Sequence, residues 1–300
     1  MAAEGVLLFG ADGQLGHELQ AELSVLGRLI PLTLADVDIA DAKALQAVIR
    51  HHAPRYIVNA AAYTAVDKAE QEPDLAQAIN AIAPGIMAAE AKSLGATMVH
   101  YSTDYVFNGQ SAQPYKESDA TDPLSVYGRS KRDGDLQVMA QAGAFFIFRS
   151  SWVVGVHGGN FLKTMLRLAQ ERDSLSVVAD QHGVPTSARW MAQVTREALQ
   201  HPQHADLSGL YHLSNAGRTT WHGYAQYVLT QAAQMGWQLK VKPEDVKALG
   251  TADYPLPAPR PANSMLDTHL VQQNLGLTIP TWESGVMQVL SALRAQSAKN

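Results

Sequence analysis

The chain has 300 residues, of which 46% are hydrophobic, and its formal net charge is −5. This length supports a large core in one domain with an appendage or in two domains, and the acidic balance argues against general nucleic-acid binding. The chain contains no cysteine, lacks an apolar run near the ~18 residues of a membrane span, and starts without the features of a signal peptide. We therefore expect a cytoplasmic protein without disulfides or cysteine chemistry.

Short apolar runs alternate with segments of helical periodicity over the first 150 residues. The predicted strands are residues 6–9, 29–34, 56–59, 97–102 and 145–149. The predicted helices between them are residues 14–26, 42–51, 74–93 and 123–139. Strictly alternating strands and helices predict an α/β fold with a Rossmann-like, doubly wound parallel sheet.

The second half of the chain is less regular. Its predicted helices are residues 160–171, 190–200 and 222–235, and its predicted strands are residues 175–178 and 209–213. The segment 251–263 contains four prolines, which excludes a long helix and predicts a loop. We expect a dinucleotide-binding domain in residues 1–150, its sheet completed by a segment near 186–220. A smaller, mixed α/β substrate domain would be woven from residues 151–300.

A glycine-rich turn follows the first predicted strand. Gly10, Gly13 and Gly16 have the spacing G-x-x-G-x-x-G between that strand and a helix. Glycines at such a place allow a tight turn and let a pyrophosphate approach the N–H groups of the helix start. The spacing differs from the common G-x-G-x-x-G pattern, and a simple glycine-rich turn is the alternative.

The end of the second predicted strand sets the choice of cofactor. An acid there usually binds the ribose 2′-hydroxyl of NAD, but this chain has Thr33. Asp36, Asp38 and Asp41 follow within eight residues. Asp38 and Ile39 could contact the adenine, or the acids could belong to a solvated loop and a helix cap.

Tyr127 and Lys131 lie four residues apart in the predicted helix 123–139. One helical turn places the phenol and the ammonium on one face. A nearby cation lowers the pKa of a tyrosine, so the pair could exchange protons near neutrality. Two exposed helix residues would show the same spacing, and the preceding Ser102, Thr103 and Asp104 favour the catalytic interpretation.

With these pieces the chain resembles an extended short-chain dehydrogenase/reductase, and most of all the dTDP-4-dehydrorhamnose reductase family. The most specific matches are VNAAAYTAVDKAE at residues 58–70 and YSTDYVF at residues 101–107. The resemblance runs nearly end to end, through further matches at residues 10–16, 123–131, 149–152, 160–167, 180–186 and 260–264.

The resemblance implies reduction of the C4 keto group of dTDP-4-dehydro-L-rhamnose to dTDP-L-rhamnose by hydride from NADPH or NADH. Tyr127 would donate the proton to the oxyanion. Lys131 would lower the pKa of Tyr127 and hold the nicotinamide ribose. Thr103 stands where many relatives have serine and would hydrogen-bond the sugar oxygen at C4.

The resemblance also implies contacts to the substrate, a nucleotide sugar, and to the cofactor. Asp104 would bind the sugar, Trp152 would pack on the sugar or base unless it only fills the core, and Arg260 would bind the diphosphate unless it forms a surface salt bridge. The implied cofactor-binding residues are Gly10, Gly13, Gln14, Leu15, Gly16, Asp38, Ile39, Ala62, Tyr63, Thr64, Tyr101, Tyr127 and Lys131.

A metal-linked dimer is the point at which the chain departs from the family. Some members use three glutamates to build a Mg²⁺-bridged dimer. Glu18 matches one of them, but Arg189 and Ala292 stand at the other two positions. We therefore expect no bound metal, and a homodimer is compatible with the sequence but not required by it.

Two other functions remain open at this point. Another nucleotide-sugar short-chain reductase or epimerase would share the motifs, and an epimerase would retain its cofactor tightly. A non-catalytic regulatory subunit of methionine adenosyltransferase shares the fold. That subunit does not need the proton relay, so the presence of Thr103, Tyr127 and Lys131 argues against it.

Overall fold

A six-stranded sheet forms the centre of the computed structural model, which describes residues 5–297. The strand order is β10-β5-β4-β3-β1-β2, and every neighbouring pair is parallel. The strands are β1 (Val6–Phe9), β2 (Leu29–Leu32), β3 (Tyr56–Asn59), β4 (Thr97–Thr103), β5 (Phe145–Ser150) and β10 (Gly209–His212). The predicted Rossmann-like parallel sheet is confirmed, and β10 returns to its edge. The order reverses at β1, which places a ligand-binding crevice at the carboxyl ends of β1 and β3.

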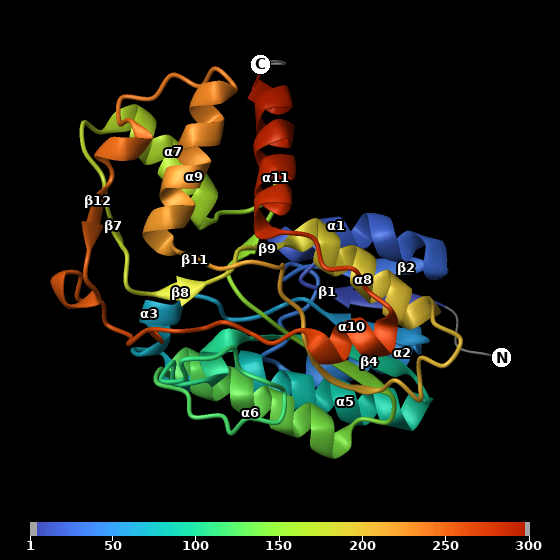
Figure 1. The fold of residues 1–300 in the computed structure, drawn as a ribbon. Coiled ribbons are helices and arrows are strands. Elements are labelled where there is room, and N and C mark those ends of the chain that lie inside the picture. Colours follow the sequence, from blue (N-terminus) through green and yellow to red (C-terminus); the bar gives the residue numbers. More distant parts are fainter. Residues whose placement is uncertain (1–4, 298–300) are drawn as a thin grey trace.

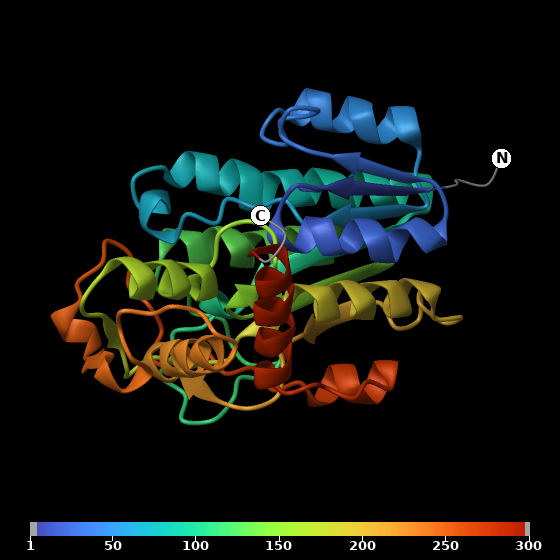
Figure 2. The same cartoon turned by 90° about the horizontal axis from the view of Figure 1, so that it is seen from above.

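Helices cover both faces of the sheet, because alternate strand residues bury on opposite sides (Figures 1 and 2). Val6 and Leu8 of β1 join the core under α1 (Gln14–Leu23), α8 (Ala188–Gln200) and α10 (His269–Leu275). Leu7 and Phe9 join the core under α2 (Ala42–His52), α5 (Ala83–Leu94) and α6 (Val126–Gln141). Strands buried on both faces explain the continuous apolar runs in the sequence.

The predicted helix 74–93 is divided by a π-helical turn. It consists of α4 (Pro73–Gln77), the π-helix η2 (Ala78–Ile82) and α5. Pro84 has no N–H for the carbonyl of Asn80, so the regular ladder is interrupted here. The side chain of Asn80 meanwhile binds the backbone of Tyr63 and the hydroxyl of Ser130. The widened turn therefore ties the loop after β3 to α6.

A second hydrophobic core lies beside the sheet and involves α7 (Phe161–Glu171), α9 (Trp221–Gln234) and α11 (Trp282–Ser297) (Figures 1 and 2). Short two-stranded pairs join its segments: β6 (Val153–Val154) with β9 (Thr186–Ser187), β8 (His182–Gly183) with β11 (Thr219–Thr220), and β7 (Ser176–Val178) with β12 (Lys247–Leu249). The sequence did not predict α10 or α11. Smaller turns are α3 (Val66–Ala69), η1 (Ser24–Leu26), η3 (Asp104–Val106), η4 (Pro243–Asp245) and η5 (Thr251–Asp253).

Within residues 5–297 every helix is too short or too polar to span a bilayer. The start of the chain, residues 1–4, lies outside the described residues.

Candidate active site

The glycine-rich turn sits where β1 passes into α1. Gly10 has φ +75°, and a Cβ there would lie 2.6 Å from the N atom of Ala61 after β3. Gly13 is the N-cap of α1 and provides no side-chain cap. The first N–H groups of α1 are therefore left for a ligand, and a helix N-terminus favours an anion.

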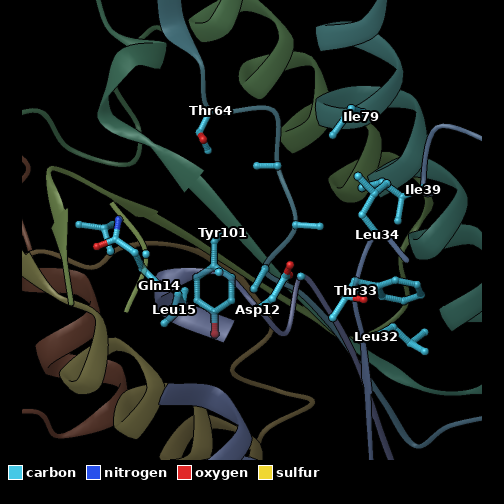
Figure 3. A pocket seen from close by; sticks show the side chains of 18 of the residues that line it. Asp12, Gln14, Leu15, Leu32, Thr33, Leu34, Ile39, Thr64, Ile79 and Tyr101 are labelled. Carbon is cyan, nitrogen blue, oxygen red and sulfur yellow. The ribbon is translucent and has the colours of Figure 1, made fainter. Parts of the chain in front are cut away.

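A cavity of about 520 Å³ extends from this turn across the carboxyl ends of the strands (Figure 3). It collects most of the predicted cofactor-binding residues, which are Gly10, Gly13, Gln14, Leu15, Asp38, Ile39, Ala62, Thr64, Tyr101, Tyr127 and Lys131. They lie in the turn after β1, at the start of α1, in the segments after β2 and β3, in β4 and in α6, so the parallel topology brings distant motifs to one edge.

Gly16 and Tyr63 are not among the residues that line the cavity. A Cβ on Gly16 would lie 2.0 Å from the Gly10 carbonyl oxygen, so this glycine lets α1 pack against the turn. The Tyr63 hydroxyl donates to Glu72 at 2.7 Å, and its backbone is held by Asn80. Both residues therefore support the site without lining the cavity.

The end of β2 borders the other side of the cavity. Leu32, Thr33, Leu34 and Val37 line it. The N–H and the hydroxyl of Thr33 both donate to Oδ2 of Asp36 at 2.8 Å, and these bonds lower the pKa of Asp36. An acid thus lies next to the uncharged selector residue, although Asp36 itself is exposed.

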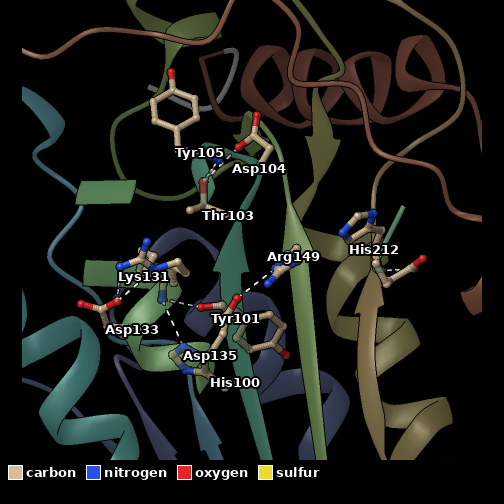
Figure 4. Close-up of polar contacts among 12 residues, drawn as sticks. His100, Tyr101, Thr103, Asp104, Tyr105, Lys131, Asp133, Asp135, Arg149 and His212 are labelled. Carbon is tan, nitrogen blue, oxygen red and sulfur yellow. Dashed lines mark hydrogen bonds and ion pairs between the residues drawn. The ribbon is translucent and has the colours of Figure 1, made fainter. Parts of the chain in front are cut away.

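Tyr127 and Lys131 lie in the first turns of α6, whose start is firmly capped. Ser125 accepts from the N–H of Gly128, and Glu70 accepts from the N–H of Val126 at 2.7 Å. Lys131 is 2% exposed and its Nζ donates to the Tyr101 carbonyl oxygen at 2.6 Å (Figure 4). Burial lowers the pKa of Lys131 to about 8, which the nearby Asp135 partly opposes.

The expectation that Lys131 lowers the pKa of Tyr127 is wrong for this structure. Burial of the phenol raises the pKa of Tyr127 to about 12, and the Thr103 hydroxyl offsets only part of the shift. Lys131 does not offset this effect of burial, and its Nζ donates to the Tyr101 carbonyl oxygen of β4. A phenol with a raised pKa stays protonated at neutral pH, so it remains available as an acid.

Thr103 ends β4 and Asp104 begins the turn η3 that follows it (Figure 4), and neither residue lines the cavity. The Thr103 hydroxyl donates to Asp104 Oδ1 at 2.9 Å. Asp104 is 2% exposed, and burial raises its pKa to about 7. Its Oδ2 makes no hydrogen bond of good geometry among residues 5–297, although the Ser264 side chain lies close enough to lower the pKa of this carboxyl in part. A buried acceptor without a partner is costly, so this oxygen is suited to a ligand hydroxyl.

Trp152 is partly buried and packs against the second core. Its ring stacks on Trp221 with centroids 3.6 Å apart, and a Cβ on Gly183 would lie 2.5 Å from it. The backbone of Trp152 has φ +45°, a conformation unusual for a non-glycine residue. Packing in the second core accounts for most of its surface, and only its edges could face a ligand.

Arg260 is paired with a carboxylate of α3, which follows β3 in the chain. Its guanidinium donates to both oxygens of Asp67, at 2.7 and 2.9 Å, and this pair lowers the pKa of Asp67. The side-chain exposure of Arg260 is 13%. The loop after residue 251 is therefore fastened over α3, and a substrate diphosphate would meet a guanidinium that is already paired.

Sequence reasoning missed several residues of the cavity wall. They are Phe9, Asp12, Leu32, Leu34, Val37, Ala60, Ala61, Ile79, Ser102, Ser150, Val153, Gly158, Gly159 and Met191. Ser102 and Ser150 could have been found, because they lie at the carboxyl ends of β4 and β5, where such sites form. Nothing in the sequence around Gly158 and Gly159 indicates that these residues line a cavity. No group of three or more potential metal ligands is present in the described residues.

Comparison with known proteins agrees with this geometry. The family model of the RmlD substrate binding domain matches residues 4–295. A protein of Salmonella typhimurium named dTDP-4-dehydrorhamnose reductase is 46% identical over 296 residues, covering 96% of this chain and 97% of that protein. A protein of the same name from Escherichia coli K12 is 44% identical, with 98% and 99% covered.

Solved structures show the same relationship. A dTDP-4-dehydrorhamnose reductase from Clostridium acetobutylicum superposes with a TM-score of 0.89 at 35% identity, covering 97% of this chain and 99% of that one. Another from Bacillus anthracis, in complex with NADP, has a TM-score of 0.87 at 36% identity, again with 97% and 99% covered. The chain therefore belongs to the dTDP-4-dehydrorhamnose reductase family of nicotinamide-dependent oxidoreductases.

Proposed function

We propose that this protein reduces the C4 keto group of dTDP-4-dehydro-L-rhamnose to give dTDP-L-rhamnose. The observation that carries the proposal is one continuous cavity that joins the glycine turn to Tyr127 and Lys131. The names of the relatives supply the substrate. The buried acceptor of Asp104 beside Thr103 offers a place for a sugar hydroxyl next to that cavity.

The residues of the cavity fit NADPH or NADH, which supplies the hydride when bound. The open N–H groups at the start of α1 would hold the diphosphate. Asp38 and Ile39 would border the adenine, and Lys131 would hold the nicotinamide ribose through its ammonium. The Bacillus anthracis relative was solved with NADP, in agreement with this assignment.

Tyr127 is proposed as the proton donor. Its raised pKa keeps the phenol protonated near neutral pH, and a proton donor must carry its proton when the oxyanion develops. The hydroxyl of Thr103, which influences the pKa of Tyr127, would hydrogen-bond the same sugar oxygen. The two hydroxyls together would stabilise the developing charge.

The second core is proposed as the substrate-binding part, beside a dinucleotide-binding part built on the six-stranded sheet. Arg260 would contact the diphosphate while still paired with Asp67. The edge of Trp152 would border the sugar or base. A cytoplasmic location and a homodimer belong to the same proposal, and cell fractionation and sedimentation test them.

The activity assay is consumption of NADPH with a panel of 4-keto-6-deoxy nucleotide sugars. We expect oxidation of the cofactor with dTDP-4-dehydro-L-rhamnose and formation of dTDP-L-rhamnose. Panel members should differ in the nucleotide, in the configuration at C3 and C5, and in the presence of the keto group. Turnover of another sugar with no turnover of the dTDP-linked rhamnose precursor would refute the substrate assignment.

NADPH is expected to be accepted at least as well as NADH. Thr33 carries no charge to repel a 2′-phosphate, unlike the acid found at this place in NAD-specific folds. Measuring kcat/KM for both cofactors checks the expectation. Asp36→Asn should move the preference further toward NADPH, and Thr33→Asp should move it toward NADH. A preference of more than about tenfold for NADH in the unaltered enzyme would show that a neighbouring aspartate serves as the ribose acid.

Activity and assembly are expected to be indifferent to EDTA. Arg189 is exposed on α8 and Ala292 offers no ligand, so Glu18 lacks two of the three carboxylates of a metal-bridged interface. Turnover and sedimentation with EDTA, and again after addition of Mg²⁺, provide the measurement. A loss of activity or of dimer that Mg²⁺ reverses would contradict the expectation.

A further inference from the structure

Two buried polar side chains lie beneath Lys131. Asn59 ends β3, His100 lies in β4, and the two are register partners in the parallel pair. They are 1% and 0% exposed. Residues paired in register point to the same face of a sheet, so the amide and the imidazole lie side by side, with 3.2 Å between Asn59 Nδ2 and His100 Nδ1.

The backbone fixes the direction of this hydrogen bond. The N–H of Ala61 donates to Asn59 Oδ1 at 3.2 Å. The amide nitrogen of Asn59 must therefore face His100, where it can only donate. His100 Nδ1 must then accept, which requires a neutral imidazole with its proton on Nε2. The imidazolium form would place two donors against each other, and burial lowers the pKa of His100 well below its usual value.

His100 therefore presents an N–H to Lys131. Nε2 lies 3.3 Å from Lys131 Nζ (Figure 4). An ammonium has three donors and no acceptor, so it cannot accept this N–H. An uncharged amine can accept it through its lone pair and still donate to the Tyr101 carbonyl oxygen, 2.6 Å away. The contacts of Lys131 are satisfied together only when its amine is uncharged.

Some of the other influences on Lys131 favour its charged form and others oppose it. Asp135, one turn further along α6, favours the ammonium, but its Oδ2 already pairs with Arg149 of β5 at 2.9 Å. Tyr127 on the same helix stays neutral because its pKa is raised. Burial opposes the ammonium most strongly and is the main reason why the pKa of Lys131 falls to about 8.

We propose that His100 is a positioning residue for Lys131: held as the Nε2–H tautomer by Asn59, it donates to the amine of Lys131 whenever that amine is uncharged, and so holds the side chain against β4 in the cofactor-free enzyme at alkaline pH. Binding of the anionic cofactor then draws a proton into the site, and the ammonium turns from His100 to the ribose. The second part rests on the proposed role of Lys131 as a cofactor ligand.

The test is proton uptake on binding NADPH without sugar, measured by calorimetry in buffers of different ionisation enthalpy. At a pH of about 9, Lys131 of the empty enzyme is mostly uncharged, and we expect uptake of about one proton per site. His100→Leu removes the donor to the amine and should raise the pKa of Lys131 by about one unit, which roughly halves the uptake. Asn59→Leu removes the amide that fixes the His100 tautomer, and it should likewise raise the pKa of Lys131 and reduce the proton uptake.

Two matched variants separate this role from simple packing. His100→Gln keeps a side-chain N–H donor and should restore most of the uptake. Met98→Leu changes a fully buried residue two positions earlier on the same face of β4 and should leave the uptake unchanged. In a turnover assay, His100→Leu and Asn59→Leu should also move the alkaline limb of kcat/KM upward by about one pH unit, whereas the control should not.

Imidazole ¹⁵N shifts of the unaltered enzyme test the tautomer directly and need no variant to fold. We expect Nε2 of His100 to be protonated and Nδ1 to be unprotonated. The opposite tautomer, an imidazolium, or the absence of proton uptake at pH about 9 would overturn the proposal, as would unchanged uptake in both leucine variants. Because NADPH binds here without sugar, an enzyme that fails to reduce the sugar would leave these results unaffected.

Discussion

Tyr127→Phe is expected to lower kcat by roughly 10²–10⁴ while the fold and cofactor affinity are retained. The substitution removes only the hydroxyl and keeps the ring, which meets Tyr105 edge-on with centroids 6.0 Å apart. This fall in kcat corresponds to the rate enhancement that a positioned general acid provides. It should appear equally in kcat and kcat/KM, because the hydroxyl acts as the oxyanion develops.

Tyr224→Phe is the matched control for this experiment. The Tyr224 hydroxyl is buried in the second core and has no hydrogen-bond partner in the described part of the chain. Its removal should leave kcat unchanged and should not destabilise the protein, because an unpaired buried hydroxyl costs free energy. A Tyr127→Phe enzyme with near-normal kcat would show that the proton comes from another group.

Asp135→Ala is expected to reduce the free energy of unfolding by about 3–5 kcal/mol. Asp135 and Arg149 are 0% and 4% exposed and pair at 2.9 Å. Removing the carboxylate would leave a guanidinium buried beside the ring of Phe107. Arg149 Nη1 already lacks a partner among residues 5–297, and the nearby carboxylate of Glu117 is engaged by the backbone N–H of His212.

Glu171→Ala provides the comparison for denaturant unfolding curves. It removes the carboxylate of the Arg167–Glu171 pair, one helical turn apart and 60% and 54% exposed. Such exposed pairs contribute about 0.3–0.5 kcal/mol. We expect a large fall in the unfolding midpoint for Asp135→Ala and almost none for Glu171→Ala. Equal midpoints would mean that water or another side chain solvates Arg149 in the altered core.

The framework of the six-stranded sheet and its flanking helices could be predicted because its signals are local. The bounds of β1 and β3 agree with the predicted strands 6–9 and 56–59, since each apolar run ends at a turn. The parallel topology alone is enough to predict that Gly10, Tyr127 and Lys131 meet, and they do line one cavity. A parallel sheet allows this, because every strand delivers its carboxyl end to the same edge.

Features that depend on contacts between distant segments could not be predicted. Nothing near Trp152 in the sequence indicates Trp221 as its stacking partner, and nothing near Arg260 indicates Asp67. The predicted direction of the Tyr127 pKa shift was wrong because burial of the phenol raises the pKa, and burial depends on segments far apart in the sequence. Pro84 signals an interruption of the helix, but the contacts of Asn80 with Tyr63 and Ser130 in that turn join distant segments and could not be predicted.

The tryptophans give the two halves of the molecule different optical properties. All five lie after residue 150, and Trp152, Trp221, Trp237 and Trp282 belong to or pack against the second core. Trp190 of α8 packs against the core of the sheet, so indole emission reports mainly, and not exclusively, on the second core. The stacked pair Trp152 and Trp221, 3.6 Å apart, should also couple its electronic transitions and give a paired circular-dichroism band. During unfolding, loss of that band would report the loss of packing in the second core separately from the unfolding of the sheet.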